Sequence, residues 1–207
     1  MEVELKYGVP DLATFAHLRD LSRLGDYELH HAGEQHLVDH YLDTAGRILW
    51  RSGYTCRLRQ RLGDGWRATV KSLGVAQGAL HQREEHEVDV PPGALPPAWP
   101  DGPARRLVLG RAGAEPLIEL FVIRQQRAMR AVRQGERLVA ELSLDVGEIE
   151  ARGQWELIRE IEVELEPGGT LDDLRVIDQA LQAYGLQPQP RSKFERALAL
   201  LDTHKEV

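Results

Sequence analysis

The sequence is poor in cysteine, in methionine and in long apolar runs, and each shortage narrows the class of protein it encodes. Its single cysteine, Cys56, excludes an intramolecular disulfide and favours a reducing compartment. No apolar run approaches the ~20 residues of a membrane-spanning helix. The strand-like pattern begins at the first residue, so we expect no signal peptide. A soluble, cytoplasmic protein with no membrane partner is therefore the expectation.

Positive charge is also in deficit. Lys and Arg number 26 against 33 Asp and Glu, which gives a formal net charge of −7. This balance argues against nucleic acid as a partner, although it leaves room for an anionic ligand in a local cationic pocket. With 207 residues, 42% of them hydrophobic, we expect one domain spanning residues 1–207. The sequence leaves monomer and homodimer both open.

Alternating polar and apolar residues predict strands over most of the chain. We expect about eight, joined mostly by antiparallel hairpins such as the one at Gly63-Asp64-Gly65. They are residues 1–7, 34–43, 54–61, 65–72, 80–90, 118–133, 136–147 and 155–166. Helices are predicted at 10–25, 103–112, 170–185 and from Ser192 onward. This pattern indicates an α+β fold: an eight-stranded antiparallel β-barrel, closed or nearly closed, with flanking helices.

Charged residues occupy one face of nearly every predicted strand. In the first strand Glu2, Glu4 and Lys6 share a face, because side chains alternate along a strand. The other charged faces are Arg57 and Arg59; Arg67 and Lys71; Arg83, Glu85, Glu87 and Asp89; Arg137, Glu141 and Asp145; and Glu160, Glu162, Glu164 and Glu166. Any one of these alone is typical of a solvated surface. Their recurrence favours a charged cavity, because charges inside a barrel must be paired or bind a charged ligand.

The aliphatic faces of two strands support this interpretation. Residues 136–147 present Leu138, Ala140, Leu142 and Leu144 opposite their charges, and residues 155–166 present Ile161, Val163 and Leu165. If these faces pack outward under helices, the charged faces line the barrel interior. There, bases would face phosphates, and acids would face the divalent metals that accompany phosphates.

In order and spacing, the charged motifs resemble the CYTH domains, also called triphosphate tunnel metalloenzymes, over essentially the whole chain. The matching motifs are Glu2-x-Glu4-x-Lys6, Tyr41-Leu42-Asp43-Thr44, Arg57-x-Arg59, Lys71, Arg83-x-Glu85, Arg127, the acids Asp145, Glu160 and Glu162, and Ser192-Lys193-Phe194. Within the family, residues 78–83 and 99–102 are similar to bacterial inorganic triphosphatases. Those proteins often carry a C-terminal CHAD domain, which we expect this chain to lack.

The resemblance implies metal-dependent hydrolysis of a small triphosphate, inorganic triphosphate above all, to pyrophosphate and phosphate. It implies catalytic roles for Glu2, Glu4, Lys6 and Lys193. Phosphate binding would fall to Lys6, Arg57, Arg59, Lys71, Arg83, Arg127 and Lys193. Mg²⁺ or Mn²⁺ would be held by Glu2, Glu4, Glu85, Asp145, Glu160 and Glu162. The pattern around Arg127 does not alternate cleanly, which allows a β-bulge there.

Other functions stay open at this stage. The cavity could bind polyphosphate or a nucleotide without turnover. Thiamine triphosphatase and class IV adenylyl cyclase share the fold by resemblance and would be supported by an aromatic platform, for which the candidates are Trp50, Trp66, Trp99 and Trp155. RNA 5′-triphosphatase lacks support, since no basic exterior is evident.

His36 and His40 share a strand face, but a histidine pair without a third ligand is more often structural than a zinc site. Cys56 is expected in the core.

Overall fold

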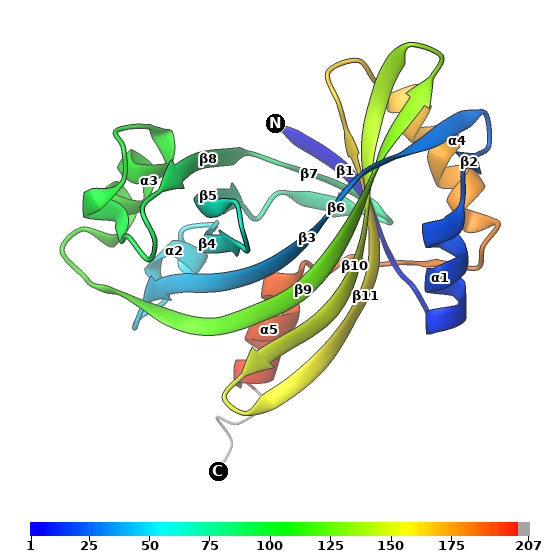
Figure 1. Ribbon diagram of the computed structural model, residues 1–207. Helices are drawn as coiled ribbons and strands as arrows, with labels where there is room; N and C mark the ends of the chain where they lie inside the picture. Colours follow the sequence, from blue (N-terminus) through cyan, green and yellow to red (C-terminus); the bar gives the residue numbers. More distant parts are fainter. Residues whose placement is uncertain (203–207) are drawn as a thin grey trace.

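The computed structural model describes residues 1–202, and a single twelve-stranded antiparallel sheet dominates them (Figure 1). The strands are β1 (Glu2–Gly8), β2 (Arg23–Leu24), β3 (Tyr27–Thr44), β4 (Tyr54–Arg61), β5 (Gly65–Ser72), β6 (Val75–Gln77), β7 (Leu80–Arg83), β8 (Glu85–Val90), β9 (Leu117–Gln134), β10 (Arg137–Ala151), β11 (Gln154–Leu165) and β12 (Gln187–Pro188). The helices are α1 (Leu12–Asp20), α2 (Ile48–Arg51), α3 (Pro103–Ala112), α4 (Leu171–Gln182) and α5 (Lys193–Asp202), with a 3₁₀ turn at Pro96–Ala98. The predicted α+β class is confirmed.

The sheet curls into a tunnel without its hydrogen-bond ladder closing. Strand order runs β6-β7-β1-β11-β10-β9-β3-β4-β5-β8. The segment 80–90, predicted as one strand, is divided in two because β7 pairs with β1 whereas β8 pairs with β5. Glu84 lies between them, and its backbone N–H and carbonyl both bond to Ser72. One run of chain therefore joins the two ends of the curled sheet.

The long strands also depart from prediction. β3 begins at Tyr27 rather than at residue 34, so the strand also includes His30 and His31. The ladder is regular around Arg127, which faces Asp145 on β10. The register of β9 with β3 shifts at two places: between His31 and Gly33, opposite Arg130 and Met129, and between Tyr41 and Leu42, opposite Phe121 and Glu119. The three shortest strands, β2, β6 and β12, were not predicted.

Apolar side chains on the convex side of the sheet pack under helices. Leu142 and Leu144 of β10 lie in one core with Phe15 of α1 and Ile177 of α4. Leu58 of β4 belongs to a second core, under α3. The predicted outward packing is confirmed for Ala140, Leu142 and Leu144 and for Ile161 and Val163. It is wrong for Leu138, because the register shift between Leu138 and Ala140 places Val139 in this core instead. Within residues 1–202, no helix has both the length and the apolar character to cross a membrane.

Helix α5 instead packs on the concave side of the sheet. Ser192 caps it as predicted, because its hydroxyl accepts from the Glu195 N–H while the Glu195 carboxylate bonds back. Phe194 packs against Tyr41 and Phe121, ring centroids 5.4 Å apart in both pairs. Figure 1 shows α5 beneath the arch of β9, β10 and β11. An apolar cluster thus fills this end of the curled sheet and leaves the charged part above it.

Candidate active site

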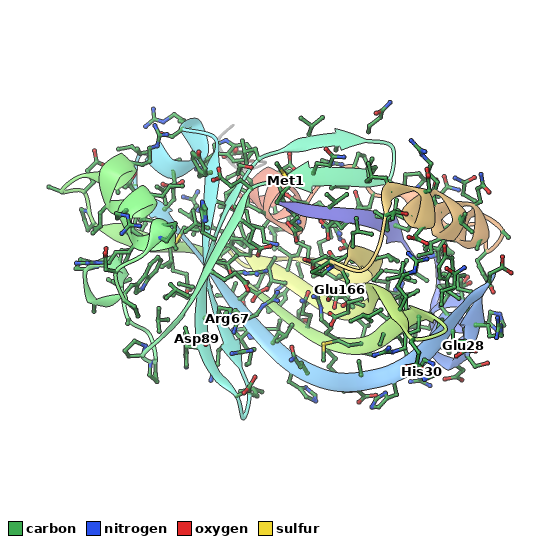
Figure 2. The ribbon with its side chains drawn as sticks, turned by 90° about the horizontal axis from the view of Figure 1, so that it is seen from above. Met1, Glu28, His30, Arg67, Asp89 and Glu166 are labelled. Atoms are coloured by element: carbon green, nitrogen blue, oxygen red, sulfur yellow. The ribbon has the colours of Figure 1, made fainter. Side chains whose placement is uncertain are left out.

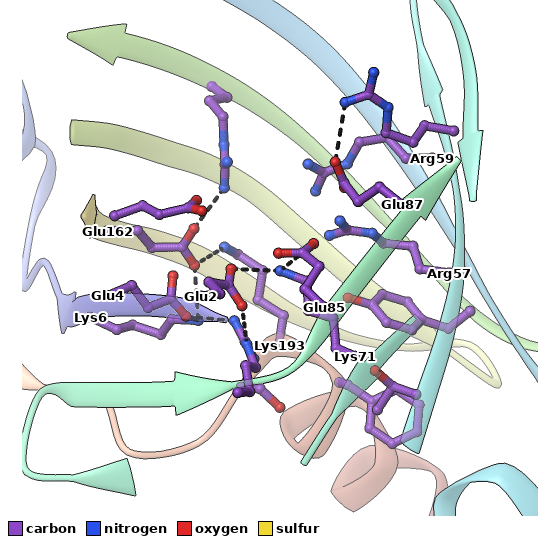
Figure 3. Close-up of a pocket in the computed structure, with 18 of the residues that line it drawn as sticks. Glu2, Glu4, Lys6, Arg57, Arg59, Lys71, Glu85, Glu87, Glu162 and Lys193 are labelled. Carbon is purple, nitrogen blue, oxygen red and sulfur yellow. Dashed lines mark hydrogen bonds and ion pairs between the residues drawn. The ribbon is translucent and has the colours of Figure 1, made fainter. Parts of the chain in front are cut away.

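A charged cavity of about 300 Å³ occupies the concave side of the sheet (Figure 3). Eleven of the thirteen predicted site residues line it: Glu2, Glu4, Lys6, Arg57, Arg59, Lys71, Arg83, Glu85, Arg127, Glu162 and Lys193. In Figure 3, Glu2, Glu4, Lys6 and Glu162 lie on one side and Arg57 and Arg59 on the other, with Lys71 and Glu85 between them. The strands thus bring residues far apart in sequence to one polar chamber.

The acidic side centres on Glu2, which bridges two bases. Lys71 Nζ lies 2.7 Å from Glu2 Oε1, and Arg83 Nε lies 2.5 Å from Glu2 Oε2. Arg83 also reaches Glu4 at 2.5 Å. Burial alone would raise the pKa of the Glu2 carboxyl, but Lys71 and Arg83 outweigh burial and hold that pKa below its usual value. Glu2 is therefore an anion at neutral pH.

The carboxylates of Glu2, Glu85 and Glu164, from three different strands, form one cluster. One oxygen each of Glu2, Glu85 and Glu164 lies within 4.8 Å of the others. Partial removal from water and the nearby Glu2 carboxylate raise the pKa of Glu164 to about 7. Crowded carboxylates of this kind suit a hard divalent cation. Glu164 was missing from the predicted metal ligands, although it belongs to the same alternating face as Glu160 and Glu162.

Two predicted metal ligands lie deeper than the cavity wall. Asp145 is fully buried and accepts two hydrogen bonds from Arg127, at 2.8 and 2.7 Å. Glu160 is 1% exposed and pairs with Arg196 and with Lys193. Neither lines the cavity. Asp145 holds Arg127, and Glu160 holds Lys193 and Arg196. Arg196 was not predicted as part of the site.

The cavity floor is a compact ion network. Lys193 Nζ lies 2.7 Å from Asp145 and 2.9 Å from Glu162, and Lys6 Nζ lies 3.0 Å from Glu162. Burial would lower the pKa of Lys193, but Asp145, Glu160 and Glu162 raise it above its usual value. Both lysines therefore carry a charge at neutral pH, since acids likewise raise the pKa of Lys6 against its burial.

The basic side is held by a residue that the sequence did not single out. Asp39 of β3 is fully buried and accepts two hydrogen bonds from Arg59, while Arg57 lies 3.6 Å away. Burial would raise the pKa of Asp39, yet Arg59 and Arg57 hold it far below the usual range. The arginines are thus fixed in place with donors directed at the chamber.

The comparisons with known proteins agree with this architecture. A family model described as the CYTH domain matches residues 1–198. The chain belongs to the CYTH domain family. Among solved structures, a Hippeastrum protein with a described dominant triphosphatase activity has a TM-score of 0.75 and 21% identity, each chain covered to 96%.

Two further structures share the CYTH-like fold. A Pyrococcus horikoshii protein has a TM-score of 0.59 and 19% identity, covering 97% of this chain and 99% of its own. The Mimivirus capping enzyme triphosphatase has a TM-score of 0.50 and 11% identity, covering 87% of each chain. At these identities the likeness is one of fold, and function must be argued from the site.

The tryptophans, His40 and Cys56, which the sequence had raised as candidates for other functions, lie outside the cavity of this CYTH domain. No tryptophan is among the lining residues: Trp50 packs on Phe194, Trp66 stacks on His40, Trp99 is buried and Trp155 is exposed. His40 bonds to Glu119 at 2.6 Å. Cys56 is fully buried in the core under α3, and burial raises the pKa of its thiol to about 12. Its predicted core position is confirmed.

Proposed function

We propose that the cavity hydrolyses inorganic triphosphate to pyrophosphate and phosphate with Mg²⁺ or Mn²⁺. One observation carries the proposal: three crowded carboxylates and several arginines line the same cavity, whose volume is about 300 Å³. Phosphoryl transfer depends mainly on positioning and on neutralising charge, and this chamber supplies both. Membership of the CYTH family and the triphosphatases among its structural neighbours support hydrolysis of a phosphoanhydride bond.

The basic residues would bind the phosphate chain. Arg57 and Arg59 present planar guanidinium groups, which suit paired contacts to phosphate oxygens. Lys71 and Arg83 contact Glu2, so they would hold the phosphate nearest to the cluster of Glu2, Glu85 and Glu164. Lys6, Arg127 and Lys193 would neutralise the chain from the floor. Substrate phosphates would compete with the carboxylates that now bond these groups.

The donor set fits a divalent metal. Glu2, Glu85 and Glu164 offer only oxygen ligands, and the pKa of Glu164 is raised by its partial burial and then by the neighbouring Glu2 carboxylate, whose charge a cation would offset. When bound, such an ion would polarise the phosphoryl group and lower the pKa of a coordinated water. Glu4 and Glu162 would orient the neighbouring bases, and Asp145 and Glu160 would hold Arg127 and Lys193 from behind the wall.

Inorganic triphosphate suits this chamber better than a nucleoside or thiamine triphosphate. Among lining residues the only aromatic rings are Tyr41 and Phe194, and both pack in the apolar cluster around α5. The volume lies near the lower end of small-molecule sites, ~300–1,000 Å³. A base would therefore have no stacking platform among the lining residues. We place the activity in the cytoplasm, in keeping with the single buried thiol.

A substrate panel tests the proposal directly. Phosphate release should be measured from inorganic triphosphate, thiamine triphosphate and ATP, each with Mg²⁺, with Mn²⁺ and with EDTA. We expect metal-dependent release that is highest for inorganic triphosphate. Tight calorimetric binding of triphosphate without any turnover would instead make the chain a binding module. Preference for thiamine triphosphate or ATP would overturn the proposed substrate.

A further inference from the structure

A stripe of arginines continues beyond the part of the cavity that a triphosphate needs. Arg57, Arg59 and Arg61 alternate along β4, so their side chains point to the same face. Arg67 lies opposite Arg59 on β5. All four line the cavity. Same-face residues on a strand repeat every ~6.6 Å, so the β4 stripe extends over ~13 Å.

Exposure rises along this stripe toward solvent. The side chains of Arg57 and Arg59 are 11% and 13% exposed, whereas those of Arg61 and Arg67 are 18% and 32% exposed. Asp89, which contacts both outer arginines, is 69% exposed. In Figure 2 Arg67 and Asp89 lie together at the β5–β8 edge of the sheet. Arg61 and Arg67 thus form the rim of the chamber.

The rim arginines are held differently from the inner ones. Arg59 bonds the fully buried Asp39 with two hydrogen bonds. Arg61 instead contacts the exposed acids Asp64 at 3.1 Å and Asp89 at 3.5 Å, and its buried Nε has no hydrogen-bond partner among residues 1–202. Arg67 contacts Asp89 at 2.8 Å and Glu87, whose side chain is 37% exposed, at 3.1 Å. Exposed ion pairs contribute little stability, so a phosphate can displace these acids far more easily than it can displace Asp39.

We propose that Arg61 and Arg67 form a rim subsite for the phosphates beyond the third in a linear polyphosphate. This inference rests on the proposed function, because the first three phosphates are assigned to the inner chamber. Guanidinium groups with displaceable partners suit repeated anionic groups of a flexible chain. The rim subsite makes Arg61 and Arg67 determinants of chain-length selectivity, so longer chains compete effectively with triphosphate.

The test compares chain lengths in matched variants. Binding of triphosphate, tetraphosphate and a medium-chain polyphosphate is measured by calorimetry in EDTA, and kcat/KM is measured for each with metal. In Arg61→Ala and Arg67→Ala, the preference for longer chains over triphosphate should fall about tenfold, as expected from the loss of one charge-assisted hydrogen bond. Asp89→Asn should raise that preference, because it removes a competing carboxylate from both arginines.

A control variant and the binding arm separate this inference from the proposed function. Arg106→Ala removes an arginine that pairs with exposed Asp101 on α3, outside the cavity, and should leave the preference unchanged. If no substrate is hydrolysed but the rim variants lose polyphosphate affinity, the rim subsite stands and the hydrolase proposal fails. If the wild-type protein binds longer chains no better than triphosphate, or the rim variants weaken every chain length equally, the rim subsite is refuted.

Discussion

Asp39 Oδ1 accepts from Arg59 Nε at 2.7 Å and Asp39 Oδ2 accepts from Arg59 Nη2 at 2.8 Å, which joins β3 to the basic side of the cavity. Asp39 is fully buried and Arg59 nearly so. Two parallel hydrogen bonds fix the guanidinium plane, so this pair determines which direction the remaining donors of Arg59 face. Asp39 is thus a positioning residue for phosphate binding.

Asp39→Asn should destabilise the protein and weaken substrate binding. The amide keeps the shape of the carboxylate but leaves Arg59 and Arg57 with an uncompensated buried charge, which typically costs about 3–5 kcal/mol. Urea denaturation measures this loss. Asp101→Asn, which breaks an exposed pair with Arg106, should change the free energy of unfolding by less than about 1 kcal/mol. Equal effects of the two substitutions would refute the assigned role of Asp39.

Glu4→Gln should reduce phosphate release by about 10- to 100-fold while the fold persists. Glu4 is 3% exposed and contacts both Arg83 and Lys6, so its charge balances two of the proposed phosphate-binding groups. Losses of this size are expected when a group that orients a metal or substrate ligand is removed. Glu150→Gln, outside the cavity in an exposed pair with Arg124, is the matched control. A fully active Glu4→Gln protein contradicts this role.

Arg59→Ala, on the basic side of the cavity, should affect substrate binding and metal binding to different degrees. Arg59 lies across the chamber from Glu2 and Glu4 (Figure 3), so its removal should weaken triphosphate binding more than Mn²⁺ binding. Loss of one charge-assisted hydrogen bond corresponds to roughly tenfold or more in Kd. Calorimetric titrations with each ligand alone measure the two affinities. Parallel losses of both would show that Arg59 acts through the fold.

Metal affinity should depend on pH through Glu164. Its pKa is raised to about 7, so below pH 7 a proton competes with the cation for this carboxylate. Apparent Mn²⁺ affinity should therefore fall as pH decreases from 7 to 5, with a proton released on binding. Calorimetry in buffers of different ionisation enthalpy counts that proton. Glu164→Gln should bind Mn²⁺ more weakly and abolish the proton release, and persistence of that release would exclude Glu164 as its source.

In the absence of metal, Glu164 should also make the free energy of unfolding depend on pH. The folded protein binds a proton at Glu164 more tightly than the unfolded chain does, since the pKa rises from 4.5 to about 7. The free energy of unfolding therefore falls as pH rises from about 4.5 to about 7. In Glu164→Gln this part of the pH dependence should disappear from thermal unfolding curves recorded in EDTA. An unchanged slope would assign it to another group.

Local sequence pattern predicted which residues face the interior where the strands are regular, and it failed at Arg137, which lies before the register shift on β10 and pairs with Asp173 of α4. Glu2, Arg57 and Glu162 all lie on cleanly alternating runs, and alternation fixes the face of a strand whatever its partners. It does not fix depth along the tunnel. Asp145 and Glu160 are on the correct face but lie behind the cavity wall, at the level where the α5 side chains enter.

Relationships between distant strands were beyond the reach of the pattern. Asp39 acquires its role from register, because β3 pairs with β4 so that Asp39 faces Arg59. The division of 80–90 at Glu84 likewise follows from the curl of the whole sheet, since β7 and β8 pair with strands at opposite ends of it. A run that alternates smoothly across Glu84 carries no sign of either partner.

Arg196→Gln should raise the KM for triphosphate through Lys193. Arg196 is buried on α5 and bonds Glu156, Glu160 and the Leu157 carbonyl, and Glu160 Oε2 also lies 3.1 Å from Lys193 Nζ. Without Arg196, Lys193 is the one cationic partner left to Glu160 within residues 1–202, so Glu160 should hold it more tightly, away from substrate. A purely structural role would lower the free energy of unfolding by about 3–5 kcal/mol but leave KM unchanged at temperatures where the variant is folded. Steady-state kinetics at such a temperature distinguish the positioning role from the structural role. Only positioning through Glu160 raises KM while kcat is largely kept. Arg175→Gln, on the exposed face of α4, is the control.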